Sequence, residues 1–63
     1  MLPHQERVIE EEKDLREKFK KLGAFLYGDK YDPLPDHDKD LLRWQYRHMG
    51  AYLDVLVARI KRF

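Results

Sequence analysis

The chain has 63 residues, a formal net charge of +1 and no cysteine. A chain of this length forms one domain and buries only about 60% of the surface that its unfolded form exposes, so its core is small. Because cysteine is absent, disulfides and thiolate metal sites cannot supply the missing stability. We therefore expect a homo-oligomer, and the near-neutral charge argues against long nucleic acid as a ligand.

The sequence contains no recognisable secretion or membrane segment. Residues 1–6 lack the positive and apolar regions of a signal peptide, and the longest apolar runs, 24–27 and 55–58, have four residues each. We therefore expect a cytoplasmic protein that does not associate with a membrane.

Residues 4–27 are predicted to form an amphipathic helix. Apolar residues recur at spacings of three, four and seven, and charged residues fill the other faces. Pro3 suits the start of this helix. We expect its end at Gly28 rather than at Gly23, although a glycine inside a helix costs about 1 kcal/mol. The apolar stripe consists of Val8, Leu15, Phe19, Leu22 and Leu26.

Residues 28–35 are predicted to form a turn, and residues 36–63 a second helix. Pro33 and Pro35 prevent a continuous helix. Three aspartates then crowd the start of the second helix, where carboxylates cap free N–H groups; a calcium loop would need a glycine that is missing here. These aspartates are Asp36, Asp38 and Asp40. The apolar stripe of the second helix reads Leu41, Leu42, Gln45, Met49, Tyr52, Leu53, Leu56, Ile60 and Phe63.

The predicted fold class is all-α: one antiparallel two-helix hairpin over residues 1–63, assembled into a homo-oligomeric helical bundle. Some apolar side chains lie outside the contact between the two predicted helices, and self-association would cover them. These side chains are Phe25, Tyr27, Trp44, Tyr46, Val55 and Val57. The expected oligomer interface is Phe25, Gln45, Met49, Tyr52, Leu56, Ile60 and Phe63. Gln45 and Glu12 interrupt the stripes; each either forms hydrogen bonds across an interface or reaches water.

The residue types needed for catalysis are missing. The chain has no serine, threonine or cysteine, so hydroxyl and thiol nucleophiles other than tyrosine are excluded. His4, His37 and His48 are far apart in the sequence, so no two histidines form a metal-binding pair on one helix face. We therefore expect no enzyme, no metal and no cofactor.

Basic and aromatic residues are interleaved in the second half of the chain. From Leu41 to Phe63 there are five basic residues against one acidic residue. Arginine forks pair with phosphates and aromatic planes stack on bases, so this mixture suits a nucleotide ligand. A solvated helix face combined with core aromatics gives the same pattern and stays open as an alternative. The candidate ligand-binding residues are Arg43, Arg47, Arg59, Arg62, Lys30, Tyr27, Tyr31, Trp44 and Tyr46.

An ordered set of residues spans nearly the whole chain and carries a resemblance. The set is His4-Gln5-Glu6-Arg7-Val8, Glu11-Glu12-Lys13, Leu15, Lys21-Leu22-Gly23-Ala24-Phe25-Leu26, Leu34-Pro35, Leu41-Leu42, Gln45, Met49, Tyr52, Leu56, Arg59-Ile60 and Phe63. Taken together it resembles a family of small tailed-phage proteins, also met in crAss-like phages and prophages. The sequence departs from that family in Gly23 and in its tyrosine-rich turn, which affects the helix boundary.

The resemblance implies a phage gene expressed in the cytoplasm of an infected bacterium. By architecture the chain is similar to oligomeric phage hairpins that act as sponges for the nucleotide signals of CBASS and Thoeris immunity. This analogy implies a non-catalytic protein that binds a cyclic oligonucleotide or an ADP-ribose derivative. A protein-interaction module with a host or phage partner, and a purely structural hairpin, remain open alternatives.

Overall fold

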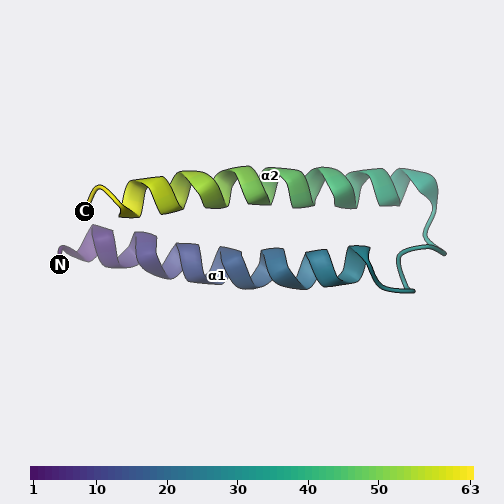
Figure 1. Cartoon of the computed structure of the whole chain (residues 1–63), viewed down its shortest axis with the longest axis horizontal. Coiled ribbons are helices and arrows are strands. Elements are labelled where there is room, and N and C mark those ends of the chain that lie inside the picture. The colour runs from purple at the N-terminus through teal and green to yellow at the C-terminus, as the bar shows by residue number, and fades with distance from the viewer.

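The computed structural model describes residues 1–63 and contains two helices, α1 (Pro3–Leu26) and α2 (Asp36–Ile60). The helices lie antiparallel in a body of 46 × 15 × 14 Å, with both termini at one end and the connection at the other (Figure 1). The predicted all-α two-helix hairpin is confirmed, while its assembly into a homo-oligomeric bundle stays a prediction. Neither helix is long and apolar enough to cross a membrane.

The ends of α1 follow from local hydrogen bonding. Pro3 occupies the first helical position, and the Leu2 backbone N–H donates to Gln5 Oε1 at 3.1 Å. At the other end the Gly28 N–H donates to the Phe25 carbonyl at 3.1 Å. No glycine has a positive φ, so α1 ends in a tightened turn rather than in a left-handed glycine cap.

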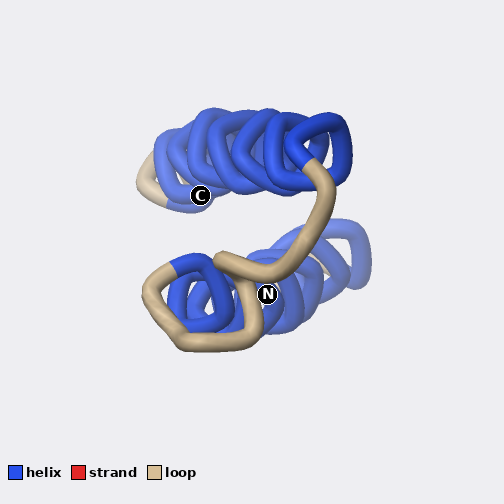
Figure 2. Tube along the Cα trace, turned by 90° about the vertical axis from the view of Figure 1, so that its right-hand side faces the viewer, coloured by secondary structure: helices blue, strands red, loops and turns tan.

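The connection and the end of α2 are also built from short-range bonds. Residues 27–35 form a loop that passes from one helix to the other (Figure 2). The expected second helix, about 36–63, is longer than α2, because the N–H groups of Arg62 and Phe63 bond to carbonyls three residues back. Three-residue hydrogen bonds tighten a final turn and replace the α-helical pattern there.

The seam between the helices holds a small core. Its buried hydrophobic side chains are Val8, Leu53 and Leu56. Glu12 is also buried, and its carboxylate accepts a hydrogen bond from Arg16 Nε at 2.8 Å within α1. The sequence did not decide whether Glu12 would bond across an interface or reach water. Since the chain offers so few buried apolar groups, the seam depends on close packing rather than on the amount of apolar surface.

Two rings and two glycines interlock in the seam. The rings of Phe19 and Tyr46 stack with their centroids 4.3 Å apart and their planes 7° from parallel. A Cβ on Gly23 of α1 would lie 3.0 Å from Tyr46 Cε1, and a Cβ on Gly50 of α2 would lie 3.1 Å from Phe19 Cε1. Each ring therefore occupies space left by a glycine on the opposite helix, which explains why Gly23 stands inside α1.

We predict that Gly23→Ala lowers the melting temperature by about 4–8 °C, although alanine is the better helix former by about 1 kcal/mol. The added methyl group meets a Tyr46 ring that Phe19 holds from the other side, and overpacking of this kind costs about 1–3 kcal/mol. Thermal unfolding followed by circular dichroism at fixed protein concentration measures the effect.

The matched control is the same substitution in a Tyr46→Leu background. Without the ring, Gly23→Ala should raise the melting temperature, because only the gain in helix propensity remains. Stabilisation by Gly23→Ala in the wild-type background would contradict the interlock.

Candidate ligand-binding site

A groove lies at the turn end of the hairpin and collects residues from the end of α1, the turn and the start of α2. It has a volume of about 340 Å³. The fold brings these segments together because the turn returns the chain to the first turns of α2. The groove is lined by Leu26, Tyr27, Tyr31, Arg43 and Tyr46. We call it the turn groove.

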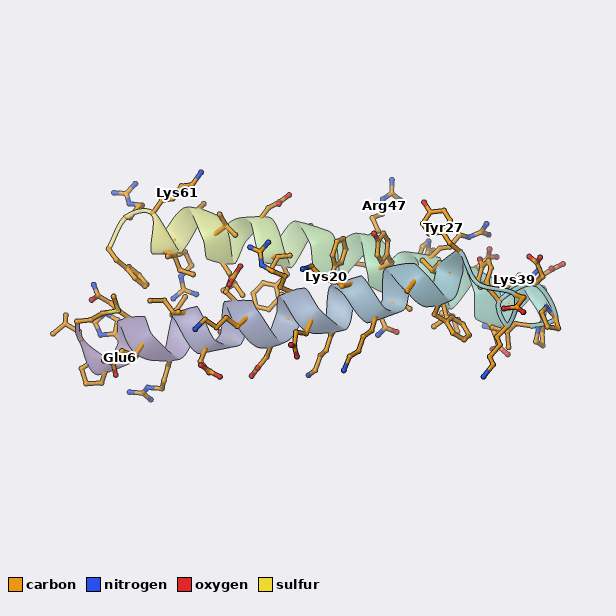
Figure 3. The ribbon with its side chains drawn as sticks, turned by 60° about the horizontal axis from the view of Figure 1, so that its bottom comes forward. Glu6, Lys20, Tyr27, Lys39, Arg47 and Lys61 are labelled. Carbon is orange, nitrogen blue, oxygen red and sulfur yellow. The ribbon has the colours of Figure 1, made fainter.

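A second groove of about 380 Å³ lies on α2 and is lined by Asp40, Arg43, Trp44 and Arg47. Arg43 lines both grooves, so one guanidinium can reach a ligand in either. Figure 3 shows Arg47 and Tyr27 toward the turn end and Lys61 at the opposite end of the hairpin. Two cationic and four aromatic candidate residues are therefore brought together at the turn end.

The Arg43 guanidinium donates a hydrogen bond to Asp40, one turn earlier on α2. This bond, with a smaller contribution from Tyr31, raises the pKa of Arg43 above its ordinary value. Arg43 is therefore a permanent cation that is already oriented along α2. An anionic ligand must compete with the Asp40 carboxylate for it, and this spacing of three residues along a helix was readable from the sequence.

Tyr31 is held as a fixed wall of the turn groove. Its hydroxyl donates to the Lys39 carbonyl at 3.3 Å, and its ring meets Phe25 edge-on with centroids 6.5 Å apart. Lys39 Nζ lies 5.5 Å from the centre of the same ring, within the range of a cation–π contact. Because these contacts occupy the ring, Tyr31 is better placed to shape the groove than to stack on a base.

The four aromatic candidates differ in how much ring surface they have free. Tyr46 uses one face on Phe19, as described above. Tyr27, by contrast, is 91% exposed and Trp44 is 62% exposed. A planar ligand group can therefore stack on Tyr27 or Trp44 without displacing a neighbour.

Three candidate residues lie outside both grooves. Lys30 is exposed in the turn but lines neither groove. Arg59 and Arg62 lie at the end of the hairpin opposite the turn. Arg59 follows Arg43 by sixteen residues, which is about 24 Å along α2. One small ligand cannot contact all four arginines of a single hairpin.

The residues expected at an oligomer interface divide between the seam and the surface. Leu56 is 0% exposed, so in the hairpin it contacts α1 and offers no surface to a second copy. Phe25, Met49 and Ile60 are half-buried. The remaining three are exposed: Gln45, Tyr52 and Phe63.

The largest groove, about 460 Å³, was not foreseen from the sequence. Its lining mixes two cations with three carboxylates and is given by Arg7, Glu10, Glu11, Asp14, Leu15, Lys18 and Tyr52. The helical spacing of these charges along α1 was the available signal. Because the carboxylates repel an anion, this groove suits a nucleotide less well than the two grooves that contain Arg43.

The fold and the grooves together define a class of protein: a small helical hairpin that carries cations and aromatic rings near its turn. The model of the Sequestin family matches residues 2–62. The chain therefore belongs to the Sequestin family. No curated protein and no solved structure matches the chain significantly.

The Tyr52 hydroxyl donates to the Glu11 carboxylate across the seam, and this bond raises the pKa of Tyr52 above its ordinary value. The raised pKa means that the bond stabilises the fold below the unfolded-state pKa of about 10, and that this stabilisation is lost as pH rises through the folded-state pKa. We predict that Tyr52→Phe lowers the melting temperature at pH 7 and lowers it much less at pH 11.

Tyr27→Phe is the control, because the Tyr27 ring is almost fully exposed and its hydroxyl has no partner in α1 or α2. Its melting temperature should match the wild type at both pH values. A deficit of Tyr52→Phe that is equal at pH 7 and pH 11 would show that the bond to Glu11 does not stabilise the fold.

Proposed function

We propose that the protein is a phage-encoded, non-catalytic sponge that binds and sequesters a nucleotide-derived immune signal in the cytoplasm of the infected bacterium. The ligand class is a cyclic oligonucleotide or an ADP-ribose derivative. Membership of the Sequestin family supports this proposal, because the family's name denotes sequestration. The phage origin follows the resemblance carried by the sequence.

The observation that carries the proposal is the convergence of Arg43 and Arg47 with the free rings of Tyr27 and Trp44 along two grooves that share Arg43. Guanidinium forks bind phosphate oxygens in pairs, and exposed rings stack on bases with little dependence on base identity. A ligand that joins phosphates to planar bases can use both kinds of group at once.

Sequestration makes no demand for a nucleophile, a metal or a general base. The protein lowers the free concentration of a signal in proportion to the number of sites present, so affinity and abundance determine its effect. A chain without serine, threonine or cysteine lacks the common nucleophiles that would cleave a bound phosphodiester or pyrophosphate.

A protein-interaction module is the second candidate. The exposed apolar residues Leu41, Trp44 and Val55 on α2 favour it, because such a surface can dock into a groove of a host or phage protein. This candidate predicts no affinity for nucleotides.

Native mass spectrometry of the purified protein with a panel of cyclic di- and trinucleotides and ADP-ribose derivatives tests the proposal. We expect one class of compound to add its intact mass at a fixed stoichiometry, and to be recovered unchanged after the protein is denatured. Failure of every compound to bind would reject the sponge, and recovery of a cleaved product would identify an enzyme instead.

We predict that Arg43→Ala weakens binding of the compound found in this way by about tenfold to a hundredfold, because a charge-assisted contact to phosphate is lost. Arg43→Lys keeps the charge but loses the planar fork, and should recover only part of the affinity. Lys20→Ala is the matched control, since Lys20 is exposed on α1 and lines no groove. Equal affinity of Arg43→Ala and Lys20→Ala would remove Arg43 from the site.

A further inference from the structure

The α2 helix carries a second apolar stripe on the side that faces away from α1. Its positions recur at alternating spacings of three and four, which is the heptad pattern of a helix that packs against another helix. All seven positions are exposed. They are the apolar residues Leu41, Trp44, Ala51, Val55 and Ala58, together with His48 and with Arg62 just beyond the end of α2, and we call them the outer stripe.

The outer stripe is distinct from the seam. At 100° per residue it is rotated by about 150° from the positions that pack on α1, such as Leu53 and Leu56. Three of its large apolar side chains are 47–62% exposed, namely Leu41, Trp44 and Val55. Ala51 and Ala58 lie between them and allow a second helix to approach closely. Every exposed residue of α1 between Glu6 and Lys21 is charged, so only α2 offers such a surface.

Charged residues stand at regular spacing beside the outer stripe, and on one flank their signs alternate. On one flank every seventh residue is charged, in the order Asp40, Arg47, Asp54 and Lys61. On the other flank the corresponding order is Asp38, Gln45, Tyr52 and Arg59. Flanking residues of this kind set the orientation and register of two paired helices, because they face the flanks of the partner.

We propose that the outer stripe is the interface of an antiparallel homodimer, in which α2 of one hairpin packs on α2 of a second copy about a two-fold axis level with the Met49–Gly50 peptide. In this register Trp44 packs on Val55 of the second copy, and Leu41 packs on Ala58. The flanks then place Arg47 beside Asp54 of the second copy. Asp40 lies beside Lys61 in the same way, and two-fold symmetry repeats every contact.

Other registers place like charges together. A shift of one heptad in one direction sets Asp54 against Asp54, and a shift in the other direction sets Arg47 against Arg47. A parallel pair would stack Arg62 on Arg62 at the end of the interface. Like charges that face each other destabilise an interface, so the charge pattern selects the single antiparallel register.

In one hairpin the basic residues at the end of the chain lie far from Arg43, and the dimer brings them to the turn end of the second copy. Their use in ligand binding is the one part of this inference that rests on the proposed function. Antiparallel pairing carries Lys61 and Arg62 of the second copy to the turn end of the first. There Lys61 of the second copy competes for Asp40, which otherwise holds Arg43. In the dimer Arg47 pairs with Asp54 of the second copy and Trp44 packs on Val55 of the second copy. Arg43 lies outside the stripe and its flanks, so Arg43 and Tyr27 are the residues of the proposed site that stay free for a ligand. Base stacking then falls to Tyr27.

Charge exchange tests the register without any ligand. Sedimentation equilibrium should find wild-type dimers, and Asp54→Arg or Arg47→Asp alone should weaken dimerisation at least about tenfold, because each creates two like-charge contacts. The double variant with both substitutions should restore it. Arg47 and Asp54 are seven residues apart on one helix, about 10 Å, so rescue requires a second copy. A monomeric wild type, or a double variant no better than the singles, would overturn the proposal.

Cysteine cross-linking provides a second, independent measurement, and circular dichroism confirms that each variant is folded. The proposed register places Leu41 close to Ala58 of the second copy, whereas each residue is about 25 Å from its own symmetry mate. A mixture of the Leu41→Cys and Ala58→Cys proteins should therefore form a mixed disulfide on mild oxidation, and neither protein alone should cross-link. Cross-linking of Leu41→Cys to itself would show a parallel dimer and overturn the proposal.

Discussion

Each helix of this hairpin has only one neighbour, and that constraint governs the rest of the structure. A helix in a four-helix bundle packs against two others, whereas α1 and α2 bury apolar side chains only along one shared seam. Within that seam Leu56 alone is fully buried. The close contact of the helices therefore depends on complementary shape, because the rings of Phe19 and Tyr46 fill the space beside glycines on the opposite helix. Any further apolar surface faces outward.

The outward surface of α2 divides into two regions. One side carries the outer stripe, which resembles half of a helix–helix interface. The side near the turn carries Arg43, and the turn brings Tyr27 and Tyr31 against it. In the proposed dimer, one helix carries both the assembly surface and part of the proposed ligand site. Membership of the Sequestin family agrees with such a role.

The hairpin itself was predictable, because spacings of three and four residues report directly on one face of a helix. The partners of individual side chains were not. Tyr46 was expected to stack on a ligand, but the space left by Gly23 places it on Phe19. Leu56 was expected in an oligomer interface but is fully buried in the hairpin, because periodicity marks an apolar face of a helix and does not say which partner covers it. Arg43 and Arg59 were both listed as candidate ligand-binding residues from composition alone, although most of the length of α2 separates them.

Trp44 is the only tryptophan of the chain and lies in the outer stripe, so its fluorescence reports directly on whether α2 finds a second copy. The emission spectrum of the wild-type protein should be recorded over a wide range of concentration. A dimer that buries the outer stripe predicts a blue-shifted spectrum at high concentration that moves to the red on dilution, in step with the loss of dimer mass. A spectrum that stays red at every concentration would contradict the account.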